Sequence, residues 1–178
     1  MSPTRDRPPR HGGATGESVQ LVVARLVDWR QLRELRLQAL ADAPHAFGST
    51  LERERSFTQG EWRRRCERSV WAAAHWAGRP VGLACLGRGP DDEQTCRRIF
   101  AMWVSPSARG SSAAASLLHF LLGWAAAEGA HRVLLDVAED NLRAHHLYLR
   151  NGFRPTGEWE PLASNPAVRT VEMHFDLV

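Results

Sequence analysis

The sequence predicts a single α/β domain, because segments with strand character alternate with apolar helical segments along most of the chain. A length of 178 residues suits one domain with a substantial core, and a composition of 43% hydrophobic and 24% charged residues is ordinary for a globular protein. The most informative junction joins a strand that ends at Val104 to an apolar helix through a turn of small residues. Such a junction directs several unpaired backbone N–H groups at one point, where the helix dipole favours a phosphate or pyrophosphate.

Hydrophobic spacing, caps and turn residues predict where the individual elements lie. The expected strands cover about residues 19–27, 70–76, 80–86, 97–104, 132–137 and 170–177, with one more that begins at residue 153. The expected helices cover about residues 29–42, 59–68, 112–128 and 142–150. We expect Asp28 to cap the first helix with Gln31 as its reciprocal partner, and the polar segment from His45 to Glu54 to be an irregular loop. Residues 1–17, which are rich in Pro, Gly and Arg, are predicted to be a disordered tail, with residues 18–178 as the folded domain.

The composition argues against several classes of function. All 23 basic residues are arginine, but a formal net charge of +3 is too small to indicate nucleic-acid binding, and Arg63-Arg64-Arg65 is interpreted as the exposed face of a helix. No apolar run approaches the roughly 20 residues that span a bilayer, and no apolar signal segment opens the chain, so no membrane association is expected. Cys66, Cys85 and Cys96 lack metal-ligand spacing and are expected to be reduced thiols in a cytoplasmic protein without a metal site.

Two motifs in the second half resemble the signatures of the GCN5-related N-acetyltransferase (GNAT) superfamily, and the resemblance covers about residues 19–178. The family's acetyl-CoA motif is Arg or Gln, two residues, Gly, one residue, then Gly or Ala. It matches the segment from Arg109 to Ala114, with Ser112 where the family prefers glycine. A Cβ at Ser112 would crowd the phosphates if the turn required an unusual φ there. Further matches are Asn141, Ala144, Leu147-Tyr148 and Gly152-Phe153, and, in the first half, Asp42-Ala43-Pro44 and the segment from Phe47 to Glu52.

The resemblance implies a mixed, mostly antiparallel central sheet flanked by helices, in which two parallel strands diverge to hold acetyl-CoA. The strand that ends at Val104 would pair with the pantetheine arm, and an N–H near Val104 would face the thioester oxygen. The residues that the resemblance assigns to acetyl-CoA are Met102, Trp103, Val104, Arg109, Gly110, Ser111, Ser112, Ala113, Ala114, Asn141, Ala144 and Tyr148. The residues that it assigns to the acceptor are Phe47, Ser49 and Glu52, and His45 is the histidine expected to line the same pocket. For Asn141, a plain helix cap is the alternative.

Tyr148, the only tyrosine in the chain, occupies the family's usual general-acid position. A phenol with a pKa of about 10 can donate a proton to a departing thiolate whose thiol has a pKa near 8.5. The base is less clear, because the strand before Val104 carries no carboxylate, although many relatives place a glutamate there. Water relayed to Glu52, Glu54, Asp136 or a histidine would substitute, with none of them favoured.

The resemblance therefore implies transfer of an acetyl group from acetyl-CoA directly to a primary amine, without an acyl-enzyme. A single domain without a large insertion favours a small-molecule acceptor, and a protein amine is the alternative. Two other hypotheses about the function remain. The chain could be a non-catalytic CoA-binding or interaction module with a degenerate GNAT fold, or it could transfer a different acyl group. The resemblance is compatible with a homodimer.

Overall fold

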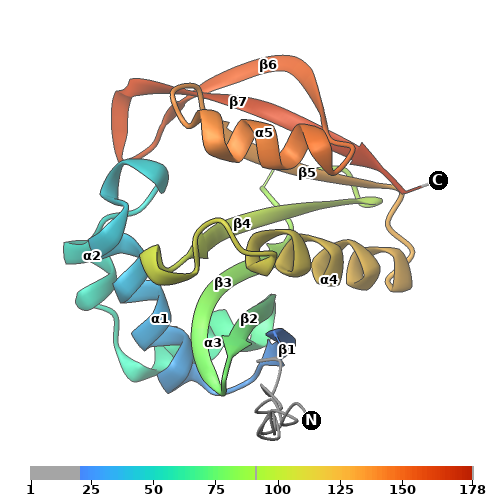
Figure 1. The fold of residues 1–178 in the computed structure, drawn as a ribbon. Helices are drawn as coiled ribbons and strands as arrows, with labels where there is room; N and C mark the ends of the chain where they lie inside the picture. Colours follow the sequence, from blue (N-terminus) through green and yellow to red (C-terminus); the bar gives the residue numbers. More distant parts are fainter. Residues whose placement is uncertain (1–20, 91, 178) are drawn as a thin grey trace, which may run out of the picture.

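The structure, a computed structural model, describes residues 21–90 and 92–177. In this part of the chain, seven strands form one sheet in the order β1-β2-β3-β4-β5-β7-β6 (Figure 1). Every neighbouring pair is antiparallel except β4 and β5. The expected α/β class with a mostly antiparallel sheet flanked by helices is confirmed. The predicted tail and the first two residues of the predicted first strand lie outside the described residues.

The element boundaries follow the sequence prediction closely in most places. The strands are β1 (Leu21–Leu26), β2 (Val70–Trp76), β3 (Arg79–Gly87), β4 (Cys96–Val104), β5 (Arg132–Ala138), β6 (Arg154–Leu162) and β7 (Asn165–Asp176). The helices are α1 (Trp29–Asp42), α2 (Leu51–Arg55), α3 (Gln59–Arg68), α4 (Ala113–Ala127) and α5 (Leu142–Arg150), with short 3-10 turns η1 (Pro44–Ala46) and η2 (Pro106–Ala108).

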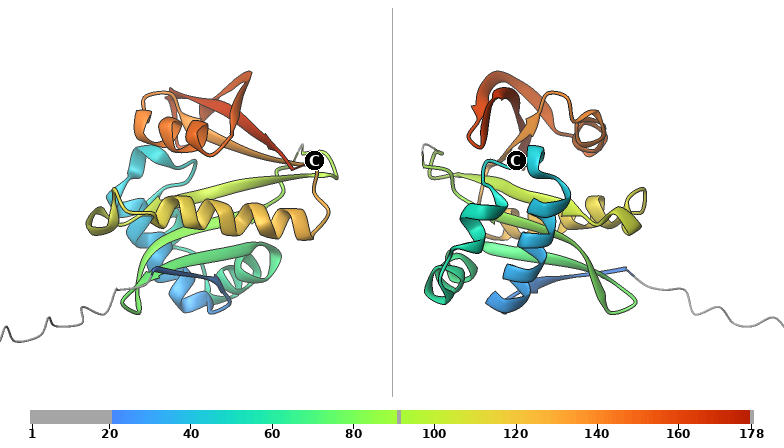
Figure 2. Two further views of the ribbon diagram at one scale, coloured as in Figure 1. Left: turned by 45° about the vertical axis from the view of Figure 1, so that its right-hand side comes forward. Right: turned by 90° about the vertical axis from the view of Figure 1, so that its left-hand side faces the viewer.

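The sheet separates two apolar cores, and alternate residues of its central strands point into each. Val70, Ala72 and Ala74 of β2 pack in the core that contains α4, whereas Trp71 and Ala73 pack in the core that contains α1 and α3. Figure 2 shows the corresponding layers, with α4 on one side of the sheet and α1 and α3 on the other. Both faces of the central strands are therefore covered by helices.

The strands β4 and β5 begin as a parallel pair and then separate. Their pairing ends at Ile99 and Leu135. Beyond that point, β4 continues beside β3 as far as Val104, and β5 continues beside β7 as far as Ala138. In Figure 1 the two strands lie close together on the right and move apart toward the left. The backbone of β4 from residue 100 to residue 104 therefore has a neighbouring strand on only one side.

A bulge in β4 lies where the strands begin to separate. Trp103 pairs with Leu83, whereas Phe100 pairs with Cys85, so β4 has one more residue than β3 in this interval. Ala101 has a φ of 56°, in the left-handed region that residues with a side chain rarely adopt. A bulge bends its strand and increases the local twist, and this bend accompanies the separation of β4 from β5.

The expectation of an irregular loop from His45 to Glu54 is wrong. The 3-10 turn η1 and the helix α2 occupy most of this segment. The Thr50 side chain caps α2 by accepting a hydrogen bond from the Arg53 N–H at 3.2 Å. The burial of Glu54 then fixes the short helix against α1, where it pairs with Arg36.

The expected N-cap of the first helix is confirmed, but its reciprocal partner is not. The Asp28 carboxylate accepts from the Arg30 N–H at 2.9 Å. The Gln31 amide does not return to the cap and instead lies 3.4 Å from the His75 ring. Tertiary contact with β2 therefore takes precedence over the local capping arrangement.

We expect Ala101→Val to lower the free energy of unfolding by about 1–2 kcal/mol, because a β-branched side chain is strained at positive φ. Ala24→Val, at an exposed position of β1 with ordinary strand pairing, is the matched control and should change stability by less than about 0.5 kcal/mol. Urea unfolding measures both variants. Equal effects of the two substitutions would show that the bulge stores no strain.

Candidate functional site

A cleft of about 1470 Å³ opens where β4 and β5 separate. Residues from the end of β4, the turn before α4, the end of β5 and the helix α5 line it. The lining continues along α1, α2 and α3 and reaches the turn between β6 and β7. Because α4 and α1–α3 lie on opposite faces of the sheet, the cleft joins the two faces through the gap between the strands.

The turn before α4 has free backbone N–H groups at Gly110 and Ala114, which line the cleft, and at the adjoining Ser112. Gly110 lines the cleft with a φ of 88°, a conformation that favours glycine. Among the residues that the structure describes, no acceptor pairs with the N–H groups of Gly110, Ser112 and Ala114. These groups lie at the N-terminus of the 15-residue helix α4, where the helix dipole is positive. The arrangement suits a diphosphate.

Ser112 does not need to be glycine for this turn to form. Its backbone has ordinary helical angles, with φ −75° and ψ −1°, and its exposed side chain makes no capping hydrogen bond. Ser111 supplies the side-chain contacts instead: its Oγ donates to the Ala108 carbonyl at 2.7 Å and accepts from the Ala113 N–H at 3.2 Å. The Cβ of Ser112 therefore imposes no backbone strain.

Asp42, at the end of α1, links the two sides of the cleft. Its carboxylate accepts from the Trp103 indole N–H at 2.8 Å and forms an ion pair with Arg109. The Arg109 Nε also donates to the Val104 carbonyl at 3.2 Å. The Arg109 side chain, which belongs to one of the residues assigned to acetyl-CoA, is therefore held against α1 and β4 in this structure.

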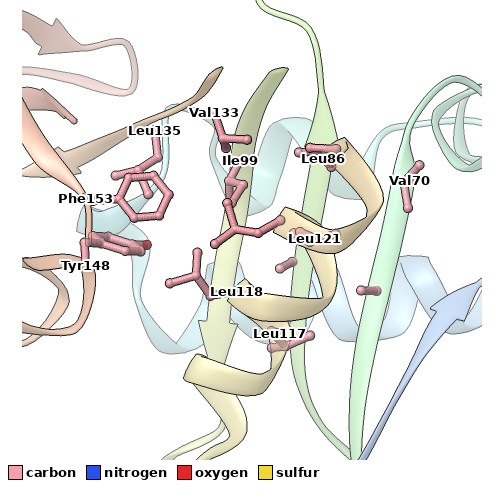
Figure 3. Close-up of a cluster of buried hydrophobic side chains, with 14 of the residues drawn as sticks. Val70, Leu86, Ile99, Leu117, Leu118, Leu121, Val133, Leu135, Tyr148 and Phe153 are labelled. Atoms are coloured by element: carbon pink, nitrogen blue, oxygen red, sulfur yellow. The ribbon is translucent and has the colours of Figure 1, made fainter. Parts of the chain in front are cut away.

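Tyr148 projects from α5 into the core beside the gap. Its ring packs against Phe153 with 5.8 Å between centroids, and it lines the cleft although only 5% exposed. In Figure 3 its hydroxyl points from α5 toward Leu118 of α4. Burial raises the pKa of the phenol well above its ordinary value. The group is therefore protonated at neutral pH and can serve as a hydrogen-bond or proton donor.

Asn141 forms the N-cap of the helix that carries Tyr148. Its Oδ1 accepts from the Ala144 N–H at 3.2 Å, so the helix-cap interpretation of Asn141 is observed. Asn141 and Ala144 both line the cleft. The cap fixes the residue at which α5 begins. It thereby helps to fix the position of Tyr148 on that helix relative to the core.

The carboxylates that the sequence offered as proton acceptors lie in different surroundings. Glu52 is exposed and outside the cleft lining, and Glu54 is fully buried in ion pairs. Asp136 of β5 lines the cleft just past the last residue that pairs with β4. Partial burial raises the pKa of Asp136, although Arg98, whose Nη1 lies 2.8 Å away, acts in the opposite direction.

A buried ion cluster lies in the part of the cleft formed by α1, α2 and α3. The Nε and Nη2 atoms of Arg36 donate to Glu54 at 3.1 and 2.9 Å, and both side chains are almost inaccessible, at 5% and 0%. Arg65, whose side chain is 34% exposed, approaches the same carboxylate at 3.3 Å. The Arg36 guanidinium also lies over the Phe47 ring, 4.6 Å from its centroid.

The cleft brings together most of the residues predicted for the site. Those that line it are Phe47, Ser49, Met102, Trp103, Val104, Arg109, Gly110, Ser111, Ala114, Asn141, Ala144 and Tyr148. Ser112, Ala113 and Glu52 do not line it, and neither does His45, which is exposed. The two functional segments of the sequence therefore converge, whereas the acceptor loop contributes only part of its expected set.

Sequence reasoning did not identify the cleft arginines Arg36 and Arg65. Arg36 carried a detectable signal, because it lies on the buried face of α1 between Leu32 and Leu40. Arg65 was included in the run Arg63–Arg65, interpreted as an exposed helix face, and for Arg65 that interpretation is wrong. Consecutive helical residues differ by about 100° in direction, so three of them cannot share one face.

Other site types find no support among the described residues. No group of three or more His, Cys, Asp or Glu side chains in residues 21–90 and 92–177 is arranged to hold a metal ion. None of the helices in those ranges is long and apolar enough to cross a membrane. Cys66, Cys85 and Cys96 are buried free thiols, and burial raises the pKa of Cys85 to about 12.

Sequence comparison relates the chain to a known family. A family model described as "Acetyltransferase (GNAT) family" matches residues 29–153. The chain is 39% identical over 90 residues to proteins described as uncharacterized N-acetyltransferases in Mycobacterium tuberculosis and Mycobacterium bovis. That match covers 51% of this chain and 55% of each relative, so it spans about half the length of these curated proteins.

Solved structures share the fold at low sequence identity. The protein yncA from Salmonella typhimurium, solved with its cofactor acetyl-CoA, has a TM-score of 0.72 at 17% identity, over 89% of this chain and 95% of that one. A GNAT-family acetyltransferase from Streptococcus pneumoniae has a TM-score of 0.71 at 16% identity, over 88% and 99% of the two chains. The ribosomal-protein-alanine N-acetyltransferase of Brucella melitensis has a TM-score of 0.69 at 18% identity, over 87% and 99%. At these identities the likeness concerns the fold alone.

We expect Glu54→Gln to lower the free energy of unfolding by about 3 kcal/mol, because two arginines then lose their shared buried counter-charge. Glu52→Gln, an exposed neighbour on the same helix, should stay within about 0.5 kcal/mol of the unsubstituted protein. Chemical denaturation compares the two variants. A small and similar change in both would mean that the ion cluster contributes nothing to folding.

Proposed function

This chain belongs to the acetyltransferase (GNAT) family, and from that premise we propose that it transfers an acetyl group from acetyl-CoA to an amine. The observation that carries the proposal is the loss of pairing between the parallel strands β4 and β5 beyond Ile99 and Leu135. The resulting cleft has unpaired N–H groups at one end and a buried tyrosine beside it. Homodimer formation stays a prediction from the family resemblance, and a cytoplasmic location stays a prediction from the cysteine pattern of the sequence.

The turn before α4 and the free edge of β4 are the proposed donor site. Acetyl-CoA supplies the acetyl group in activated form, as a thioester. The N–H groups of Gly110, Ser112 and Ala114 suit its diphosphate, since they are unpaired and lie at the positive end of α4. The backbone from Met102 to Val104, without a strand on the β5 side, suits an extended pantetheine arm. The fold shared with yncA, which was solved with acetyl-CoA, supports this assignment.

Tyr148 is the proposed proton donor to the departing sulfur. Burial raises the pKa of its phenol, which keeps the proton in place until the sulfur develops charge. Desolvation in the same crevice raises the pKa of the thiol as well, so the two groups shift in the same direction. A buried donor also stabilises a developing thiolate more strongly than a donor in water.

Asp136 is the proposed proton acceptor, acting directly or through water. Of the candidate carboxylates, it is the one that lines the cleft without being enclosed between two arginines. Its raised pKa makes it a better base than an ordinary aspartate. It replaces the glutamate that many relatives carry on the strand before Val104.

A small molecule is the proposed acceptor. The turn between β6 and β7 packs on the loop after α1, where the Ser164 hydroxyl donates to the Phe47 carbonyl and Ala163 lies against Gly48. These contacts join the β6–β7 turn to the loop between α1 and α2, along the acceptor side of the cleft. An extended peptide has less room there than a compact amine.

We expect acetyl-CoA to bind in a calorimetric titration and an acceptor screen to release free thiol. Tyr148→Phe should lower kcat by about 100-fold, because the proton donor is lost, and should leave the Kd for acetyl-CoA unchanged. No heat at millimolar acetyl-CoA would contradict the donor site. Binding without thiol release from any amine would favour the non-catalytic module, and unaltered kcat in Tyr148→Phe would remove the proposed acid.

We expect the pH profile of kcat/KM to test Asp136. The base must be ionised, so activity should fall as the pH decreases through the raised pKa of Asp136, at a higher pH than for an ordinary aspartate. In Asp136→Asn this acidic limb should disappear and the rate at neutral pH should drop by about 100-fold. Asp176→Asn, on β7 and outside the cleft lining, is the matched control. The same acidic limb in Asp136→Asn would show that another group accepts the proton.

A further inference from the structure

We propose that the acceptor carries an acidic group, a carboxylate or phosphonate, and that Arg36 and Arg65 bind it in the part of the cleft formed by α1, α2 and α3. The proposal rests on the proposed function, since it names the class of amine that the enzyme acetylates. It is carried by the geometry, burial and charge of one side-chain cluster, which neither the family match nor the related proteins assign.

Arg36 has more donors than its surroundings satisfy. Its Nε and Nη2 atoms are taken by Glu54, at 3.1 and 2.9 Å. Its Nη1 atom is buried and has no acceptor among the residues that the structure describes. Arg36 is only 4% exposed yet belongs to the cleft lining. A buried guanidinium N–H without a partner is costly, and an incoming oxyanion would satisfy it.

The cluster also has too little negative charge. Arg36 and Arg65 share the single carboxylate of Glu54, and the Arg65 contact is the longer one, at 3.3 Å. Burial and the neighbouring Arg36 lower the pKa of Arg65, while Glu54 opposes them. The cluster of Arg36, Arg65 and Glu54 therefore carries a net charge of one positive unit, and it is largely shielded from water. Arg65, with its side chain 34% exposed, is the member that a ligand in the cleft reaches most directly.

The cluster lies at a suitable separation from the proposed acetyl site. Arg36 precedes Asp42 by six residues on α1, about 9 Å along the helix axis at 1.5 Å per residue. Asp42 is hydrogen-bonded to Trp103 of β4, within the segment assigned to the donor. A small molecule with an amine at one end and an acid at the other spans such a distance.

The charges on the cleft surface formed by α1, α2 and α3 also favour an acceptor with an acidic group. The arginines that α1, α2 and α3 contribute to the cleft are Arg36, Arg53, Arg64, Arg65 and Arg68, and the acids are Asp42, Glu54 and Glu61. A polyamine or an aminoglycoside would bring several further positive charges to this surface, and like charges at a contact are unfavourable. An acceptor with a negatively charged group is attracted by the excess of arginines on this surface.

A purely structural ion pair between α1 and α2 is the alternative. It accounts for the three hydrogen bonds from Arg36 to Glu54. It does not account for the unpaired Nη1 atom or for the second guanidinium on one carboxylate. Buried ion clusters are also not needed for stability in general, since well-packed apolar residues often replace them without loss.

The direct test measures binding of product analogues, which needs no turnover. The probes are N-acetylated ω-amino acids of increasing chain length paired with their primary amides, and N-acetyl 3-aminopropylphosphonate paired with its neutral dimethyl ester. We expect each acidic probe to bind the protein about tenfold or more tightly than its uncharged partner, in the presence and absence of coenzyme A. Equal affinity of the charged and uncharged members of every pair would overturn the proposal.

Two variants locate the binding group. Arg65→Gln should reduce the ratio of acid to amide affinity by about tenfold, whereas Arg63→Gln, an exposed arginine of the same helix outside the cleft lining, should preserve it. The triple variant Arg36→Met, Glu54→Leu and Arg65→Met removes the cluster with apolar residues and is expected to remain folded. It should lose the discrimination completely. A ratio that survives in the triple variant would show that the acid binds elsewhere.

The same measurements separate this proposal from the proposed function. Calorimetry with acetyl-CoA and thiol release with an amine panel report on acetyl transfer, whatever the acceptor's charge. If the enzyme acetylated neutral amides as fast as the corresponding acids, and bound both equally, the proposed acetyl transfer would be supported. The proposal of an acidic acceptor would be overturned. Selective binding of acidic probes without any acetyl-CoA binding would support the anion site and overturn the transferase.

Discussion

The end of pairing between β4 and β5 is the constraint on which the rest of the structure depends. Each strand keeps one partner, β3 for β4 and β7 for β5, so the sheet remains continuous on both sides of the gap. Unpaired backbone groups are unfavourable unless water or a ligand satisfies them. An edge of β4 that borders a cleft of about 1470 Å³ is therefore open to an extended ligand. The bulge at Ala101 lies within β4, so β4 itself bends where it separates from β5.

The two ends of the cleft attract negative charge by different means. At the turn before α4, the attraction comes from backbone N–H groups and the helix dipole, which need no charged side chain. On the α1–α3 side it comes from the guanidinium groups of Arg36 and Arg65, which share one carboxylate. Asp42 lies between these ends and engages both Trp103 and Arg109, which couples the end of α1 to β4 and to the turn. Under the proposed function, the donor's diphosphate and the acceptor's acid occupy opposite ends, and the transferred group lies between them.

Much of this arrangement could be predicted from the sequence, because it depends on local signals. The apolar periodicity of α4 and the small residues before it indicated the turn, and the spacing around Tyr148 indicated the helix α5. Features that depend on distant contacts could not be predicted. The α2 segment lacks an apolar stripe and is held by the pairing of Glu54 with Arg36, so its composition indicated a loop. The pairing of Arg109 with Asp42 joins residues far apart in the chain, and no local pattern reports it.

The most direct measurement of the central claim is a crystal structure of this protein with coenzyme A. We expect its diphosphate within hydrogen-bond distance of the N–H groups of Gly110, Ser112 and Ala114, and its pantetheine arm along β4 in the gap that faces β5. A complex in which β4 and β5 remain paired beyond Ile99 and Leu135, or in which the coenzyme binds outside this gap, would contradict the claim.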